Sequence, residues 1–182
     1  SAYRNAFPSL PDVLNAGRAH GAMEFLIYGE DRWTFDRFFA AADAAASRLQ
    51  KQHGLKAGDR VAIAMRNRPE WAVTFVAAAL LGAVPVPLNS FGLNSELMSN
   101  LEDTTPVWLI CDTDRFERVG ASLKNLKTVP QVVVVDGAGG DVNWSELIAP
   151  GHEGYDAPAL KPDDQALILF TSGATSRAKG VE

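Results

Sequence analysis

The stretch RVAIAMRNRPEWAVTFVAAALLGAVPVPL, residues 60–88, decides the fold that we expect for this chain. Its first six residues, Arg60 to Met65, form a short run of strand length that is apolar after Arg60. Residues 71–81 are apolar almost all round, as in a helix that is covered on several sides. After Gly82, residues 83–88 form a second run of strand length. Strand, helix and strand in this order predict a parallel pair of strands joined by a crossover helix.

The boundaries of this unit follow from polar residues and prolines. Asn67 and Glu70 are spaced as in a capping box, which would start the helix, although Pro69 leaves its first residue open. Pro85 and Pro87 cannot donate the hydrogen bonds of a strand ladder. We therefore expect the second strand at an edge of the sheet or in an irregular crossing.

The pattern extends from this unit toward the N-terminus. Thr34 is placed to cap a long amphipathic helix, and Gly54 to end it. The elements expected here are a short helix around residues 10–14, a hairpin of residues 24–28 and 32–34, and the long helix of residues 35–49.

Toward the C-terminus, strands and helices continue to alternate. The expected elements are a helix at 94–103, a strand at 107–111, a helix at 114–123, a strand at 131–135 and a last strand at 166–170. The connection from Asp136 onward is rich in Gly and Pro and contains one helical turn at 143–147, and no helix or strand is expected after Gly180. This order favours a doubly wound, largely parallel α/β sheet with helices on both faces. We expect residues 1–160 to form this subdomain and residues 161–182 to begin another.

Composition limits the classes of partner. The chain has 182 residues, 47% of them hydrophobic, which is enough for a substantial core. A net charge of -5, without a stripe of Lys and Arg, argues against nucleic-acid binding and leaves small molecules as the expected partners. Cys111 has no second cysteine to pair with, and the sequence shows neither a membrane span nor a signal peptide, so we expect a cytoplasmic protein.

Other candidate sites favour structural roles. The three histidines are widely separated and lack the spacing of metal ligands, so no metal site built from protein side chains is expected. The four tryptophans occur singly and are expected to pack in cores. Two acidic pairs border strands in turn-like settings, which favours solvated caps over catalytic carboxylates. These pairs are Asp112 with Asp114 and Asp163 with Asp164.

One run is the candidate functional site: TSGATSRAKG, residues 171–180, directly after the last expected strand. Its small residues allow backbone N–H groups to face an anion, and Lys179 adds a mobile positive charge. A Walker loop would require the pattern G-x-x-x-x-G-K-[ST]. Counted from Gly173, Ala178 stands where the second glycine belongs and Gly180 where the hydroxyl belongs. The run is therefore interpreted as a phosphate-binding loop of another kind.

The run resembles the T-S-G-T-T-G-x-P-K-G loop of the adenylate-forming enzymes, the superfamily of acyl-CoA synthetases, luciferases and peptide-synthetase adenylation domains. The matching positions are Thr171, Ser172, Gly173, Thr175, Lys179 and Gly180. Three positions depart: Ala174 removes a hydroxyl, Ser176 restricts the backbone and Ala178 replaces a stiffening proline. The body of the chain is also similar to acyl-CoA synthetases, at residues 33–35, 58–63, 67–71 and 82–89.

This resemblance implies the N-terminal part of the large domain of an acyl-CoA synthetase. In that family a carboxylate attacks the α-phosphorus of ATP to give an acyl-adenylate and pyrophosphate, and the thiol of coenzyme A then displaces AMP. The implied substrates and cofactors are a fatty or aromatic carboxylic acid, ATP, Mg²⁺ and coenzyme A. Lys179 is the implied catalytic residue. The implied nucleotide-binding residues are Thr171, Ser172, Gly173, Ala174, Thr175, Ser176, Lys179 and Gly180.

The resemblance also implies that much of the enzyme is missing. In the family the adenine, ribose and metal-associated residues and most of the acyl pocket come later in the sequence, so we expect a fragment that is inactive by itself and binds ATP very weakly. A peptide-synthetase adenylation domain is less favoured, because no carrier-domain sequence is present. From another class, a non-catalytic binding or assembly module that retains the fold stays open.

Overall fold

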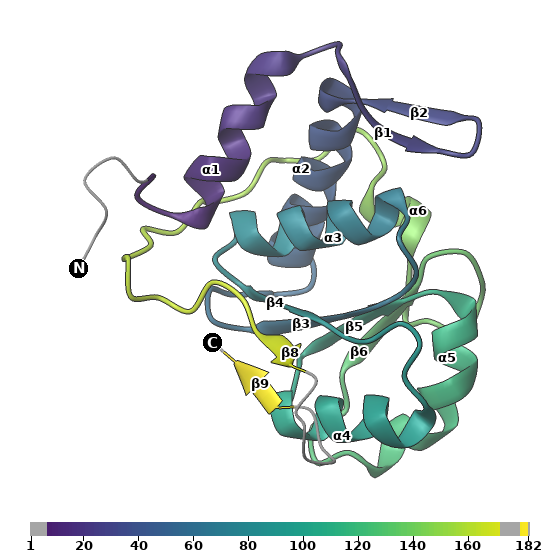
Figure 1. Ribbon diagram of the computed structural model, residues 1–182. Helices are drawn as coiled ribbons and strands as arrows, with labels where there is room; N and C mark the ends of the chain where they lie inside the picture. The colour runs from purple at the N-terminus through teal and green to yellow at the C-terminus, as the bar shows by residue number, and fades with distance from the viewer. Residues whose placement is uncertain (1–6, 172–178, 182) are drawn as a thin grey trace.

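The computed structural model describes residues 7–171 and 179–181 and is centred on a parallel sheet (Figure 1). Five strands form this sheet in the order β4-β3-β5-β6-β7. Their bounds are Arg60–Ala64 for β3, Val84–Pro87 for β4, Trp108–Cys111 for β5, Gln131–Val134 for β6 and Val142–Asn143 for β7. All four pairings are parallel. The parallel sheet predicted from the continuous apolar runs is confirmed.

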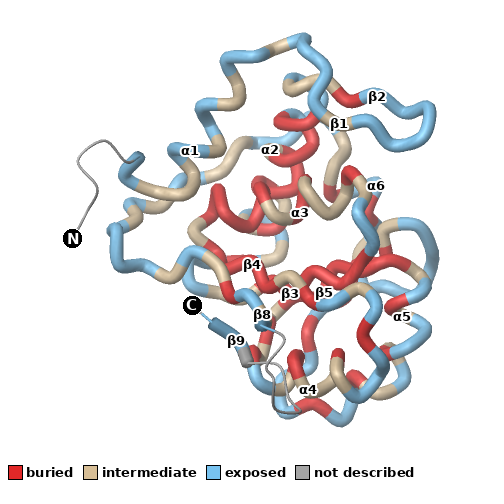
Figure 2. Tube along the Cα trace, viewed as in Figure 1, coloured by how far each residue is buried: buried red, intermediate tan, exposed pale blue. Residues whose placement is uncertain are grey.

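Helices cover both faces of the sheet. One face carries α2 (Phe35–Lys51), α3 (Pro69–Leu80) and α6 (Trp144–Leu147), and the other carries α4 (Asn94–Thr104), α5 (Thr113–Val119) and the 3₁₀ helix η2 (Gly120–Asn125). Side chains alternate between two cores, since Val61 and Ile63 pack beneath α2 and α3 while Ala62 and Ala64 face α4. Figure 2 shows the buried residues concentrated in the strands and in the helix sides that face them. The doubly wound plan is therefore confirmed.

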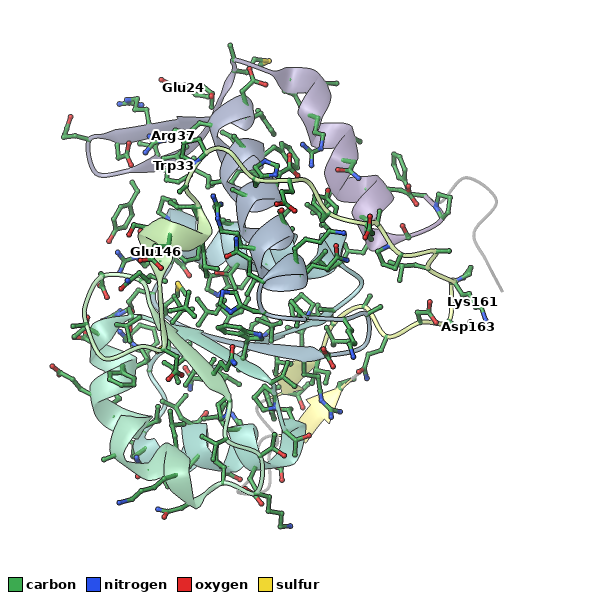
Figure 3. The ribbon with its side chains drawn as sticks, turned by 180° about the vertical axis from the view of Figure 1, so that it is seen from behind. Glu24, Trp33, Arg37, Glu146, Lys161 and Asp163 are labelled. Atoms are coloured by element: carbon green, nitrogen blue, oxygen red, sulfur yellow. The ribbon has the colours of Figure 1, made fainter. Side chains whose placement is uncertain are left out.

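The N-terminal elements agree with the sequence pattern. They are α1 (Leu10–Ala16), the 3₁₀ helix η1 (Gly17–His20), and the antiparallel strands β1 (Glu24–Tyr28) and β2 (Asp31–Thr34). The Thr34 hydroxyl accepts a hydrogen bond from the Arg37 backbone N–H at 3.1 Å, which confirms the predicted cap of α2. Arg37 also lies beside Trp33 in Figure 3, with its guanidinium carbon 4.0 Å from the ring centroid.

The predicted capping box at the start of α3 is wrong. Arg68, not Asn67, is the N-cap residue, and it makes no side-chain capping bond. Glu70 accepts a hydrogen bond from Arg68 Nε at 2.9 Å instead of reaching back to the backbone. Pro69 occupies the first helical position, where its missing N–H costs nothing and its fixed φ favours the helix.

Two short strands were not predicted from the sequence pattern. β7 has two residues, and β9 (Lys179–Val181) includes the last two residues of the glycine-rich run, where no strand was expected. β9 pairs antiparallel with β8 (Leu169–Thr171), which begins three residues later than the predicted last strand. Neither missed strand contains a run of apolar residues long enough to show a period.

The Gly- and Pro-rich connection lies against α2. Arg48 Nη1 donates hydrogen bonds to the carbonyl oxygens of Leu147 at 3.0 Å and Ala149 at 2.6 Å. Farther along, the Gln50 side chain and the Asp156 backbone exchange two hydrogen bonds, of 2.9 and 2.8 Å. These contacts hold the connection along the molecule until it reaches β8. Of the helices that the structure describes, none is both long and apolar enough to cross a bilayer.

Candidate functional site

The two ends of the glycine-rich run are held opposite each other by the β8–β9 hairpin. Its antiparallel register pairs Leu169 with Val181, Phe170 with Gly180 and Thr171 with Lys179. Three of the residues implied in nucleotide binding, Thr171, Lys179 and Gly180, are therefore brought together by backbone pairing. The others, Ser172, Gly173, Ala174, Thr175 and Ser176, lie outside the described residues.

The β8–β9 hairpin lies beside the β4 edge of the parallel sheet (Figure 1). Ile168, just before β8, is only 5% exposed and belongs to the core beneath α4. Its backbone N–H donates a hydrogen bond of 3.1 Å to the carbonyl oxygen of Pro85 in β4. Phe170 is half-buried against the same core, whereas Leu169 and Thr171 are exposed. The hairpin thus has one side packed on the scaffold and one side open.

A groove of about 550 Å³ runs along the open side of the hairpin. Besides residues 162–167, it is lined by Leu169, Thr171 and Val181. The outer bend of the connection carries Lys161 and Asp163, both exposed, as Figure 3 shows. The Asp164 carboxylate accepts a hydrogen bond of 2.7 Å from the Lys161 backbone N–H, so the solvated cap predicted there is confirmed for Asp164.

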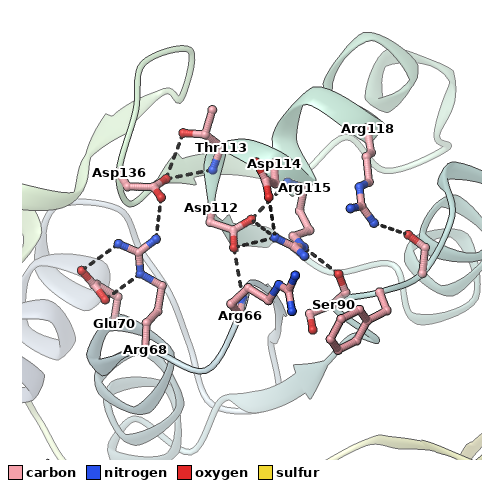
Figure 4. A network of polar contacts seen from close by, with 12 residues as sticks. Arg66, Arg68, Glu70, Ser90, Asp112, Thr113, Asp114, Arg115, Arg118 and Asp136 are labelled. Carbon is pink, nitrogen blue, oxygen red and sulfur yellow. Dashed lines mark hydrogen bonds and ion pairs between the residues drawn. The ribbon is translucent and has the colours of Figure 1, made fainter. Parts of the chain in front are cut away.

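A polar network crosses the carboxyl edge of the parallel sheet (Figure 4). We call Arg68, Glu70, Thr113 and Asp136 the carboxyl-edge network. Arg68 follows β3 and donates to Glu70 Oε2 at 2.9 Å and to Asp136 Oδ2 at 2.5 Å. Asp136 follows β6 and also accepts from the Thr113 N–H at 2.8 Å and from its hydroxyl at 2.9 Å. The network therefore ties the loops after β3 and β6 to the start of α5.

The contacts of this network shift the pKa values of its charged groups. Burial alone would lower the pKa of Arg68, but the hydrogen bonds to Glu70 and Asp136 raise it above its ordinary value. Partial burial alone would raise the pKa of Asp136, but the hydrogen bonds from Arg68 and Thr113 lower it below its ordinary value. Both groups therefore remain charged near neutral pH, which suits a structural link rather than proton transfer.

Asp112 and Arg115 form a buried ion pair beside this network. Their exposed fractions are 4% and 1%, and Arg115 Nη1 lies 3.0 Å from Asp112 Oδ2. Asp112 also accepts from the Arg66 backbone N–H at 3.0 Å, while Arg115 Nε donates to the Ser90 carbonyl oxygen at 2.7 Å. The pair thus joins the loops that follow β3, β4 and β5.

The solvated cap predicted for Asp112 is wrong. Asp112 does cap α5, accepting from the Arg115 backbone N–H at 3.1 Å, but it does so out of contact with water. Because Arg115 lies in the first turn of α5, its guanidinium reaches back over the end of β5 and neutralises the Asp112 carboxylate. An arginine three residues after an acidic cap that directly follows a buried strand was the signal available in the sequence. Asp114 is exposed, as predicted.

The described residues outside the β8–β9 hairpin have the character of a scaffold. Burial raises the pKa of the Cys111 thiol to about 12, helped by nearby Asp112 and Asp136, so the thiol stays protonated and is a poor nucleophile at neutral pH. Within residues 7–171 and 179–181, no three His, Cys, Asp or Glu side chains gather into a group that could hold a metal ion.

Known proteins are similar to this chain in sequence. The sequence profile of the family described as AMP-binding enzyme matches residues 14–182. Benzoate–CoA ligase of Thauera aromatica is 28% identical over 167 residues, which are 92% of this chain and 31% of that protein. L-proline–[L-prolyl-carrier protein] ligase of Streptomyces coelicolor is 32% identical over an alignment of 185 positions, gaps included, that covers 97% of this chain and 34% of that protein. The chain thus spans about a third of the length of these curated relatives.

A solved structure is also similar to this chain. O-succinylbenzoate coenzyme A synthetase from Bacillus subtilis, solved in complex with AMP, superposes with a TM-score of 0.74 at 28% identity. The superposition covers 95% of this chain and 42% of that one. The structural match therefore has the same extent as the sequence matches, nearly all of this chain and less than half of the relative.

Proposed function

The chain belongs to the AMP-binding enzyme family, and from this membership we propose that it is the N-terminal part of an ATP-dependent acid–thiol ligase. Such an enzyme would join a carboxylic acid to AMP and then pass the acyl group to a thiol. The names of the two relatives support this class, since one is a ligase of coenzyme A and the other a ligase of a carrier protein. Coenzyme A is the acceptor that we propose for this chain, and a fatty or aromatic acid its partner.

One observation carries the proposal: the register of the β8–β9 hairpin sets Thr171 opposite Lys179. The run between these residues begins and ends at one place, beside the groove that Thr171 lines. We propose that this run binds the β- and γ-phosphates of ATP through backbone N–H groups and hydroxyls, with the Lys179 ammonium neutralising charge. Both reactants of adenylation are anions, so placing positive charge and N–H donors at the phosphates lowers the barrier.

The remaining parts of the reaction would come from the rest of the enzyme. The relatives are about three times as long as this chain, and we propose that their further length holds the adenine, ribose and acyl sites and the residues that act with Mg²⁺. The separate sheet of β8 and β9 supports the proposal that residues 161–182 begin a second subdomain. We place the enzyme in the cytoplasm, where the thiol of Cys111 would stay reduced.

Replacing Lys179 in the full-length enzyme tests the proposal. Lys179→Ala should lower the rate of adenylate formation about 100-fold, because one donor to the developing charge is lost. Lys161→Ala, at the exposed outer bend of the connection, is the matched control and should leave the rate unchanged. Stopped-flow measurement of pyrophosphate release gives both rates, and an unchanged rate in Lys179→Ala would contradict the proposed role.

The 182-residue chain gives a second test. Because it would lack the sites carried by the rest of the enzyme, we expect no ATP–pyrophosphate exchange from the purified chain. Detectable exchange that the Lys179→Ala variant abolishes would show that the phosphate-binding run acts without the rest of the enzyme. That result would contradict the proposal that the reaction needs sites in the rest of the enzyme.

A further inference from the structure

Gly180 of β9 lies directly against Ile168. A Cβ atom added at Gly180 would stand 3.1 Å from Ile168 Cγ2, tighter than an ordinary van der Waals contact, and 3.8 Å from Phe170 Cε1. The φ of Gly180 is not in the left-handed region, so the backbone would accept a larger residue there. The neighbouring isoleucine, rather than the backbone conformation, leaves little room for a side chain at this position.

Ile168 in turn is fixed to the scaffold by two kinds of contact. Its side chain is 5% exposed within the core that also contains Val84, Val86 and Leu97. Its N–H bonds to the Pro85 carbonyl oxygen, and since a proline has no N–H, Pro85 cannot return a second bond of this kind. The position of the β8–β9 hairpin against β4 therefore depends heavily on the Ile168 side chain.

We propose that Ile168 is the positioning residue of the phosphate-binding run. By occupying the space over Gly180, it sets how closely β9 approaches the core and so fixes the point at which the run ends. Ile168 is not among the residues implied in nucleotide binding, and it acts through Gly180, one residue after Lys179. This inference rests on the proposed function, because the run is assigned to ATP there.

The contact makes a pair of substitutions interdependent. Gly180→Ala alone crowds the new methyl group against Ile168 Cγ2 and pushes β9 outward. Ile168→Ala removes Cγ2, so the same methyl group then enters vacated space and causes no further displacement. Residues in contact show such non-additive effects, whereas distant ones do not. Ile168→Val keeps Cγ2 and should behave like the unaltered chain.

The first measurement uses the 182-residue chain without any nucleotide. Amide hydrogen exchange of Leu169 and Val181, which face each other in the β8–β9 ladder, is followed by NMR and reports how firmly the hairpin is held. Gly180→Ala should speed this exchange about fivefold, and it should have no further effect in the Ile168→Ala background. Val132→Ala is the matched control, a buried residue of β6 in the same core, and in its background Gly180→Ala should keep its full effect.

The second measurement uses the full-length enzyme. Gly180→Ala should raise the KM for ATP about fivefold and leave the KM for the acid unchanged, and the rise should be absent in the Ile168→Ala background. Gly180→Val, which adds a larger side chain at the same point, should raise the KM for ATP further, and it keeps the inference testable if Ile168→Ala fails to fold.

The outcomes separate this inference from the function on which it rests. Full additivity of Gly180→Ala and Ile168→Ala in hydrogen exchange would overturn the positioning role, whatever the enzyme does. A full-length enzyme that forms no adenylate would overturn the proposed function, while the exchange data would still decide whether Ile168 positions the hairpin. Equal effects of Gly180→Ala and Gly180→Val on the KM for ATP would also contradict the inference.

Discussion

Strands β5 and β8 are of similar length but are held in different ways. All four residues of β5 are buried, and β3 and β6 pair with it on both sides. The three residues of β8 are exposed, half-buried and exposed, and β9 pairs with it on one side. Figure 2 shows the contrast as red for the sheet and pale blue or tan for the hairpin. The sheet is stabilised by burial on two faces, whereas the element that carries the candidate site depends on a few contacts such as Ile168.

If this contrast is correct, substitutions at the sheet should unfold the protein, and substitutions on the open side of the hairpin should not. Local stability varies across a protein in this way when one region has few buried apolar contacts.

The largest loss is expected from the buried ion pair at the end of β5. Asp112→Ala leaves the Arg115 guanidinium buried without its carboxylate, and it should lower the free energy of unfolding by about 3–5 kcal/mol. Urea denaturation followed by circular dichroism measures this loss. Asp114→Ala is the control, because Asp114 also reaches Arg115 but has an exposed side chain, and its effect should stay within about 0.5 kcal/mol. Similar losses in both variants would contradict the structural role of the pair.

A direct comparison of the two strands uses the same substitution in each. Leu109→Ala in β5 empties a site with 0% exposure and should cost about 3 kcal/mol of unfolding free energy. Leu169→Ala in β8, where the leucine is 48% exposed, should cost less than about 0.5 kcal/mol. Thermal and urea unfolding of the two variants side by side gives the difference. Equal costs would show that the hairpin is as much a part of the core as the sheet.

A smaller loss than at Asp112 or Leu109 is expected at the carboxyl-edge network, which is partly open to water. Asp136→Asn should cost about 1 kcal/mol at pH 7, reduced by the solvent that reaches a side chain with 36% exposure. The pKa of Asp136 is lowered in the folded protein, so its contribution is complete above about pH 4, the ordinary value for an aspartate, and is lost as the pH falls through the folded value.

Unfolding by urea at pH 7, 5 and 3 tests this pH dependence. The difference between the unaltered chain and Asp136→Asn should be the same at pH 7 and 5 and should shrink at pH 3. A difference that persists unchanged at pH 3 would show that Asp136 acts through packing and not through its charge.

The sequence predicted the scaffold well because burial on two faces leaves a strong pattern. Residues 61–65 and 108–111 are continuous apolar runs, and the helices between the strands have their own period, so the order of elements could be read directly. The location of β4 at an edge of the sheet was also predictable, since Pro85 and Pro87 exclude a central position in the sheet. The two-residue β7 and the strand Lys179–Val181 were missed because so few residues show no periodicity.

The sequence pattern could not predict contacts that depend on how the elements pack. The glycine-rich run at 171–180 was recognised from its residue types, but its pairing across Thr171 and Lys179 comes only from the structure. Asp112 was expected in water, because the return of Arg115 over the strand end is a matter of packing. In the same way Ile168 looked like any apolar residue of a strand, and its contact with Gly180 appears only when β9 is in place.

Hydrogen–deuterium exchange of the full-length enzyme, with and without ATP, decides whether the β8–β9 hairpin holds the nucleotide. Peptides that cover residues 169–181 should exchange more slowly when ATP is bound, and peptides that cover β5 should exchange at the same slow rate in both states. Slower exchange elsewhere in the enzyme, with residues 169–181 unaffected by ATP, would contradict the assignment of the phosphate-binding run.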